Sequence, residues 1–236
     1  MSDNYFWLSE AEFARLEPLL PTDTRGVPRV DDRRVISGIV HVLKSGGRWA
    51  DAPAVYGPHK TLYNRFVRWA AKGVWTDIFH ALAAAGGPPA EVLIDSSAVK
   101  AHRCASGGKG GSAIRRYRGG RSTNIHALTD AFCRPIAFLL TGGQVADCTA
   151  ADTLLEQMPE TTVLHGDKGY DSNAIRRKIE ARGAAPNIPP KSNRRWKPCF
   201  SPAFYRDRNA IERMFGRIKD FRRIATRYDR LAVCRT

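Results

Sequence analysis

The chain has 236 residues, 43% of them hydrophobic, which allows one or two domains with a sizeable core and excludes a wholly disordered protein. Its 38 Lys and Arg residues outnumber its 23 Asp and Glu residues, so the net charge of +15 indicates a polyanionic partner, although a solubilising surface is an alternative. The sequence contains no apolar run long enough to span a membrane, no signal pattern and no CxxC pair, which favours a cytoplasmic protein without a membrane partner, disulfide framework or zinc finger.

Helical spacing dominates the first third of the chain. Ser9 and Glu12 form a capping box that opens a predicted helix over 9–20, and a turn-rich linker follows. Three further helices are predicted over 32–43, 60–72 and 75–85. The run Gly86-Gly87-Pro88-Pro89 is the clearest breaker in the chain, so we predict a helical domain over residues 1–86 and a second domain over 87–236.

The predicted helix over 60–72 has two distinct faces. Leu62, Phe66 and Trp69 would pack inward. The outward positions carry side chains that can donate to phosphates and base edges, namely Lys60, Thr61, Tyr63, Asn64 and Arg68. A helix of this kind after a Gly-Pro turn favours a helix-turn-helix that binds DNA, while a generic amphipathic helical domain explains the spacing nearly as well.

Short strands alternate with helices in the second half of the chain. The predicted elements are a strand over 91–95, a hairpin over 125–140, a helix over 150–157, a strand over 162–164, a helix over 172–182 and a last long helix over 207–223. Asp95 would end the first of these strands, Asp167 would follow a later one, and Glu212 would lie in the middle of the last helix.

Each of these acids alone is more typical of a cap, a turn or a surface position. Together, in a basic chain, they indicate a cation site, because converging carboxylates repel one another unless a cation neutralises them. Mg²⁺ prefers oxygen ligands, and two such ions can activate water and stabilise a leaving oxygen during phosphodiester cleavage.

Basic residues are concentrated near these acids. Residues 96–129 contain no Asp or Glu, and this stretch carries four closely spaced arginines, Arg115, Arg116, Arg118 and Arg121. In the last helix, Tyr205, Arg208, Glu212 and Lys219 share one face, and a neighbouring apolar face would dock the helix on the sheet. An exposed helix with salt bridges along it is the alternative explanation for this spacing.

Four stretches of the sequence carry a family resemblance. YRDRNAIERMFGRIK, from Tyr205 to Lys219, resembles the Tyr-x2-Arg-x3-Glu-x6-Lys signature around the third acid of bacterial insertion-sequence transposases. HGDKGYDS around Asp167 resembles the second-acid motif of that family, and LIDSSAVKAH around Asp95 resembles the first. The segment from Leu20 to Trp69 is similar to the helical DNA-binding domain of the insertion-sequence-five group.

The resemblance implies an α+β protein, with a helix-turn-helix-like DNA-binding domain followed by a ribonuclease H-like mixed α/β catalytic domain. Asp95, Asp167 and Glu212 would bind two Mg²⁺ ions, with Mn²⁺ as a substitute. The implied activity is that of a DDE transposase, which hydrolyses a phosphodiester at the transposon end and transfers the freed strand into target DNA. Tyr205, Arg208 and Lys219 would position double-stranded DNA, Arg115 to Arg121 would contact the terminal inverted repeat or the target, and a homodimer would act on DNA in the bacterial nucleoid.

One departure from the family pattern concerns the end of the chain. Family members usually continue beyond the motif that matches RYDRLAV into a further helix, whereas this sequence stops at Thr236, so we expect a truncated C-terminal helix. A second hypothesis is therefore a catalytically impaired copy that binds transposon ends and represses the element. A ribonuclease H-like repair nuclease would explain the acids, but not the helical segment that precedes them.

Overall fold

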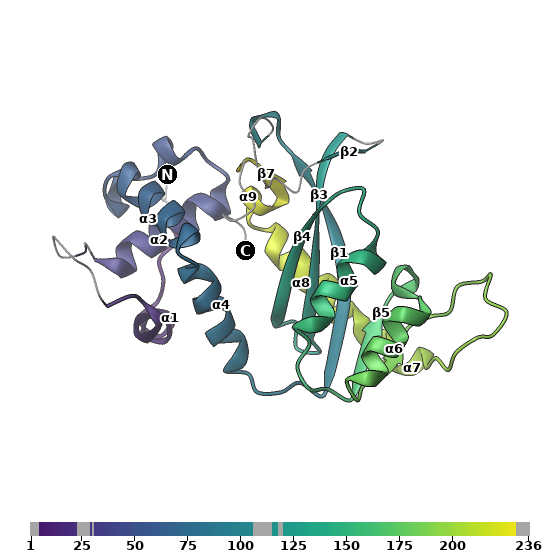
Figure 1. Ribbon diagram of the computed structural model, residues 1–236. Helices are drawn as coiled ribbons and strands as arrows, with labels where there is room; N and C mark the ends of the chain where they lie inside the picture. The colour runs from purple at the N-terminus through teal and green to yellow at the C-terminus, as the bar shows by residue number, and fades with distance from the viewer. Residues whose placement is uncertain (1–4, 23–28, 30, 106–114, 118–119, 230–236) are drawn as a thin grey trace.

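The structure is a computed structural model that describes residues 5–22, 29, 31–105, 115–117 and 120–229, with the side chains of 115–117, 120 and 207 outside the description. An N-terminal group of helices is followed by a mixed sheet with helices on both faces (Figure 1). No helix among the described residues is both long and apolar enough to cross a bilayer.

The helical region begins with the predicted capping box, since Ser9 accepts a hydrogen bond from the backbone of Glu12 and the Glu12 side chain accepts one in return. Its α-helices are α1 (Glu10–Leu16), α2 (Asp32–Ser45), α3 (His59–Ala71) and α4 (Val74–Ala84). Short 3₁₀ segments follow α1 (Glu17–Leu19) and connect α2 to α3 (Trp49–Asp51 and Ala54–Tyr56). Gly46 ends α2 with φ 78°, a left-handed conformation that costs glycine little. The predicted linker falls mainly on residues 23–28, which lie outside the described residues.

The inward face predicted for α3 is confirmed. Leu62 and Phe66 pack in a cluster with Val35 and Ile39 of α2, and Trp69 packs in a second cluster beside it. At the outward positions of the sequence pattern, the same helix leaves Lys60, Tyr63, Asn64 and Arg68 exposed and Thr61 half-buried.

A central strand organises the second region. The strands are β1 (Glu91–Ala101), β2 (Arg115–Tyr117), β3 (Gly120–Asp130), β4 (Pro135–Gly142), β5 (Val163–Gly166), β6 (Ala185–Asn187) and β7 (Thr226–Arg227). They form one sheet in the order β2-β3-β1-β5-β6, with β4 also paired to β3 and β7 to β1. β1 runs antiparallel to β3 and parallel to β5.

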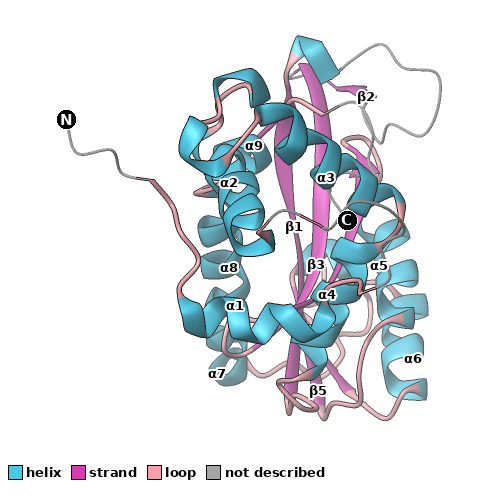
Figure 2. Cartoon of the chain, turned by 90° about the vertical axis from the view of Figure 1, so that its left-hand side faces the viewer, coloured by secondary structure: helices cyan, strands magenta, loops and turns pink. Residues whose placement is uncertain are grey.

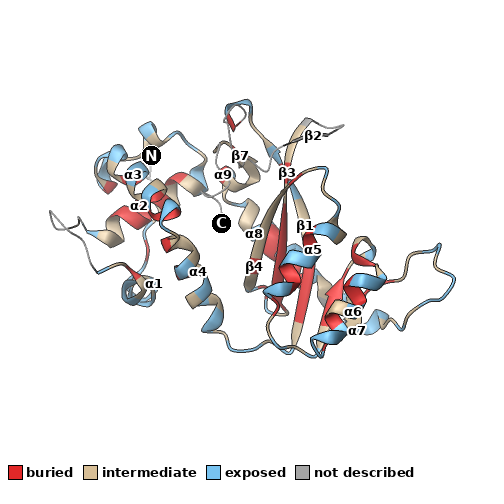
Figure 3. Ribbon diagram, in the orientation of Figure 1, coloured by how far each residue is buried: buried red, intermediate tan, exposed pale blue. Residues whose placement is uncertain are grey.

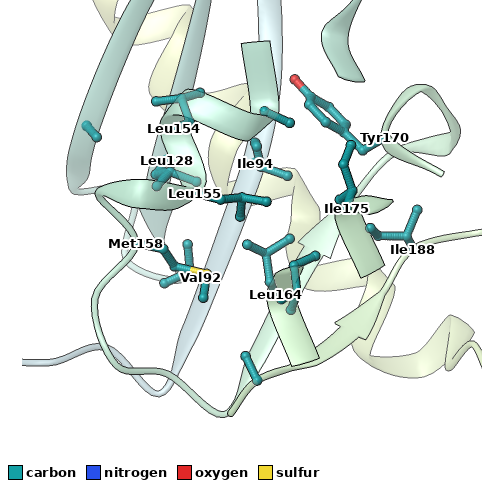
Figure 4. Packing of buried hydrophobic residues seen from close by; sticks show 14 residues of the cluster. Val92, Ile94, Leu128, Leu154, Leu155, Met158, Leu164, Tyr170, Ile175 and Ile188 are labelled. Carbon is teal, nitrogen blue, oxygen red and sulfur yellow. The ribbon is translucent and has the colours of Figure 1, made fainter. Parts of the chain in front are cut away.

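Helices cover both faces of this sheet (Figure 2). They are α5 (Asp147–Glu156), α6 (Asn173–Ala181), α7 (Pro202–Tyr205), α8 (Asn209–Lys219) and α9 (Arg222–Ala225), with 3₁₀ turns at Arg103–Ala105, Lys168–Tyr170 and Arg206–Arg208. Because strand side chains alternate, Val92 and Ile94 pack with α5 and α6, as Figure 4 shows, while Leu93 packs under α8. In the sheet region, the buried residues, coloured red in Figure 3, lie on the strands and on the helices that pack against them.

The helical region contacts the sheet region at α9 and at β4. Arg223 of α9 donates to the backbone oxygen of Gly47 at 2.9 Å, and its guanidinium lies over the ring of Trp49. Phe79 of α4 packs against Phe138 of β4, with ring centroids 5.4 Å apart. The segment that follows α2 therefore contacts α9, and the middle of α4 contacts β4.

Several predicted elements are wrong in extent, and three of these differences bear on the acids. β1 does not end at Asp95 but runs on to Ala101, because its second half pairs with β3 as far as Lys100. The helix predicted over 207–223 is divided into a 3₁₀ turn, α8 and α9, so Glu212 lies in the first turn of α8 rather than in the middle of a long helix. α5 starts at Asp147, three residues before the predicted start.

The buried carboxylate of Asp171 holds the long loop that follows β6 through hydrogen bonds. Asp171 accepts hydrogen bonds from Arg176 at 2.9 Å, from Arg194 at 2.5 Å and from the backbone of Lys191 at 2.8 Å. Burial acts to raise the pKa of Asp171, but these donors outweigh it and hold the pKa at about 2.

Asp171→Asn is expected to lower the free energy of unfolding by about 2 kcal/mol at pH 7, because it removes charge-assisted hydrogen bonds. The folded-state pKa is below the unfolded value of about 3.9, so this contribution is present at neutral pH and is lost as pH falls toward about 2. Urea unfolding across that range should therefore show the variant and the parent converging. Asp152→Asn, at an exposed position, serves as a control. A difference in unfolding free energy between parent and Asp171→Asn that did not change with pH would contradict the stabilising role of the ionised Asp171.

Candidate functional site

Asp95 lies on the face of β1 that α8 covers. Its side chain shares that face with Leu93, Ser97 and Val99, because alternate residues of a strand point the same way. Arg208 donates to Asp95 Oδ2 at 2.6 Å, and Lys219 donates to Ser97 Oγ at 2.6 Å. Two cations that are eleven residues apart in the sequence are thus fixed along one strand.

Arg208 also connects Glu212 of α8 to β1. Its second terminal nitrogen donates to Glu212 Oε1 at 2.5 Å, and its guanidinium lies 5.4 Å from the ring centroid of Tyr205. Contacts with β1 and with one another therefore connect Tyr205, Arg208, Glu212 and Lys219. They come from α7, a 3₁₀ turn and α8 rather than from one helix.

Strand register brings the second acid beside the first. β5 is the parallel neighbour of β1, with Gly166 paired to Ile94, so the residue that follows each of them, Asp167 and Asp95, stands at the same level of the sheet. Asp167 caps the 3₁₀ turn Lys168–Tyr170 and accepts a hydrogen bond from the backbone of Gly169 at 2.8 Å. The sequence prediction that Asp167 follows a strand is confirmed.

The electrostatics of Asp95 reflect the convergence of these acids. Burial raises the pKa of Asp95, and the charges of Asp167 and Glu212 raise it further, while the Ser96 amide and Arg208 lower it. Arg208 thus supplies positive charge where carboxylates from β1, β5 and α8 would otherwise repel one another.

The donor set suits a hard divalent cation. Among the described residues, no group of three or more His, Cys, Asp or Glu side chains is close enough to hold one metal ion between them. Mg²⁺ does not need such a group, because it commonly uses one or two carboxylates and keeps several waters for the substrate phosphate. The phenol of Tyr170 is fully buried beside these acids, with Ser96 in reach of its hydroxyl but no hydrogen bond of full geometry to it in the described part of the chain. A hydroxyl placed in this way fits a site that receives a further oxygen-bearing group.

The predicted DNA-contacting residues are distributed over both regions. In α3, four of the five are exposed to solvent and Thr61 is half-buried, and all of them precede the first acid, Asp95, in the sequence. Arg121 lies in β3 and the backbones of Arg115 and Arg116 form β2, whereas their side chains and all of Arg118 lie outside the described residues. Sequence reasoning missed Ser96, Ser97 and Asp147 as neighbours of the acids, since no motif distinguishes a serine in a strand or an acid that opens a helix.

Two family models match consecutive parts of the chain. Residues 8–79 match the model described as a putative transposase of the IS4/5 family, and residues 86–234 match the transposase DDE domain. The second model alone covers more than half of the chain.

Individual proteins show the same likeness. The chain is 30% identical over 110 residues to a putative transposase of insertion sequence element IS6501 from Brucella ovis, which covers 46% of this chain and 85% of that protein. It is 32% identical over 118 residues to a putative transposase of element IS402 from Burkholderia cepacia, covering 45% and 54% respectively. Among solved structures, a piggyBac transposase synaptic complex with hairpin DNA matches with a TM-score of 0.44 and 11% identity, over 78% of this chain and 48% of that one.

Proposed function

Because this chain belongs to the IS4/5-type transposases with a DDE domain, we propose that it binds the terminal inverted repeats of its element and catalyses Mg²⁺-dependent phosphodiester hydrolysis and strand transfer. Water would cleave a phosphodiester bond at the element's end, and the freed 3′-hydroxyl would then attack target DNA. Neither step needs a covalent bond between protein and DNA. A mixed sheet with β1 antiparallel to β3 and parallel to β5 supports the proposal that residues 87–236 form a ribonuclease H-like catalytic domain.

Asp95, Asp167 and Glu212 are the residues that would hold two Mg²⁺ ions, with Mn²⁺ as a substitute. When bound, the ions supply a more acidic water and stabilise the departing 3′-oxygen. Arg208 would hold Asp95 and Glu212 close to each other before Mg²⁺ binds. Tyr205 and Lys219 lie on either side of this bridge, where they would orient the DNA backbone. Joining two ends calls for two catalytic subunits, so we propose a homodimer on DNA.

The bridge from Arg208 to both Asp95 and Glu212 is the observation that carries this proposal, since it ties acids 117 residues apart to one cation. The test is a nicking assay on DNA that ends in the element's inverted repeat, with Mg²⁺ and with chelator. Magnesium-dependent cuts at the repeat end are expected. Tight binding without any cleavage would instead favour the repressor hypothesis.

The exposed face of α3 supports a role in DNA binding. Arg68→Ala is expected to reduce the slope of log K against log salt concentration by about 1, because each neutralised phosphate contributes about 0.9. Arg15→Ala, which removes an exposed arginine from α1 of the same helical region, is the matched control. Fluorescence anisotropy across a salt series measures both slopes, and an equal slope for Arg68→Ala and the parent would remove α3 from the interface.

A further inference from the structure

A fourth carboxylate stands beside the second acid of the site. Asp147 is the first residue of α5, and its Oδ1 accepts a hydrogen bond from Ser96 Oγ at 2.7 Å. Ser96 directly follows Asp95 in β1, so this bond ties the start of α5 to the strand that carries the first acid.

The other oxygen of Asp147 faces Asp167 across Gly169. A Cβ placed on Gly169 would stand 2.8 Å from Asp167 Oδ1 and 3.2 Å from Asp147 Oδ2, so the two carboxylate oxygens border the same point. The first of these distances is too short for a real Cβ, so a side chain at this position would displace the Asp167 carboxylate. No donor in the described part of the chain reaches Asp147 Oδ2.

Asp147 also lacks a permanent cationic partner. Within the described residues, the basic side chain at ion-pair distance is His126, whose Nδ1 lies 3.6 Å from Asp147 Oδ1. That distance is too long for a hydrogen bond, Nδ1 makes none in the described part of the chain, and the other ring nitrogen of His126 is bonded to Thr141 Oγ1 at 2.8 Å. Arg208, which serves Asp95 and Glu212, makes no ion pair with Asp147 or Asp167 in the described structure.

The hydroxyl of Tyr170 lies near these carboxylates, with Ser96 in reach but no hydrogen bond of full geometry in the described part of the chain. Tyr170 is fully buried, and Figure 4 shows its phenol directed away from Ile175 and Ile188, the neighbouring members of the apolar cluster. Burial raises the pKa of Tyr170 far above its usual range, and the charges of Asp147, Asp95 and Asp167 add to that increase. A phenol can donate one hydrogen bond, so its O–H could reach a bound water or phosphate oxygen at this site.

From this geometry we propose that Asp147 is a fourth carboxylate ligand of the cation site, paired with Asp167 across Gly169 and held in place by Ser96. Two carboxylates with neighbouring water positions match the requirement of a Mg²⁺ ion that must also bind substrate phosphate. The proposal rests on the proposed function, because it assigns this residue to the same cation-dependent site.

Direct Mn²⁺ binding tests the assignment without any measurement of DNA cleavage. Free Mn²⁺ is followed by electron paramagnetic resonance during titration of the full chain, its Asp147→Asn and Asp167→Asn variants, and Asp152→Asn. Asp152 is the matched control, because it lies on α5 but pairs with Lys178 on the outer side of the helix. Asp147→Asn is expected to weaken Mn²⁺ binding by about 10-fold or more, and Asp152→Asn to leave it unchanged.

The outcomes separate this proposal from the one on which it rests. Weaker Mn²⁺ binding for Asp167→Asn but parent-like binding for Asp147→Asn would overturn the role of Asp147 and leave the transposase site intact. If the parent chain bound no Mn²⁺, both proposals would fail. Should Asp147→Asn not fold, as judged by its thermal transition, Ser96→Ala decides, because it removes the 2.7 Å bond and keeps every carboxylate. About 10-fold weaker binding is expected from Ser96→Ala, because partners that orient a metal ligand typically contribute that much to metal affinity, and unchanged binding would reject the proposal.

Discussion

Asp167→Asn is expected to reduce cleavage at the transposon end by at least about 10³-fold, which corresponds to about 4 kcal/mol of transition-state stabilisation. The substitution keeps the size of the side chain and its bond from the Gly169 amide, but it removes the negative charge beside Asp95. An amide oxygen is a weaker ligand for Mg²⁺ than a carboxylate. The rate is measured with end-labelled repeat DNA under single-turnover conditions.

Binding to the repeat should stay within about twofold of the parent, because the proposed DNA contacts of α3 lie on a separate part of the molecule. Asp152→Asn on the exposed side of α5 should retain both binding and cleavage. If Asp167→Asn lost binding in proportion to cleavage, the residue would serve the DNA interface or the fold rather than the cation site.

Phe66→Ala is expected to lower the free energy of unfolding of the helical region by about 3–5 kcal/mol. The ring is 6% exposed, it contacts the ring of Trp49 at 5.1 Å between centroids, and its backbone oxygen accepts the indole N–H of Trp75. Removing it leaves a cavity among Val35, Ile39 and Leu62 that neighbouring aromatic rings cannot easily fill. Urea unfolding monitored by tryptophan fluorescence gives the change.

Asn64→Ala on the exposed side of the same helix is the control, with an expected change of less than about 0.5 kcal/mol. A Phe66→Ala variant as stable as the parent would mean that α3 presents its other face to the core. The predicted recognition residues would then be buried, and the proposed DNA interface would fail together with the packing.

Local signals in the sequence identified most helices and their ends. The Ser9–Glu12 box, the glycines after α2 and α3, and the Ser172 cap of α6 all act through bonds or dihedral angles within a few residues, so they can be read without the fold. The apolar spacing of α8 likewise predicted the face that now packs on β1 and β3.

The extent of β1 and the break in the last helix could not be predicted in this way. Residues 96–100 have little apolar character, and they are held in a strand by pairing with β3, whose residues come more than twenty positions later. The long polar face from Tyr205 to Lys219 fits an unbroken helix, but the chain turns near Arg208, where the guanidinium reaches Asp95 and Glu212.

By itself, the sequence determined the order of the main helices and of strands β1, β3, β4 and β5, the inward and outward faces of α3 and α8, the three candidate acids and the family. Composition, periodicity and motifs are properties of neighbouring residues, so they can be read without the fold. Only the tertiary structure decided that Asp95 and Asp167 stand level on adjacent strands, that Arg208 spans two acids, and that Asp147 joins them across Gly169. Such contacts depend on strand register and on the close approach of distant backbones, and neither quantity is encoded by spacing along the chain.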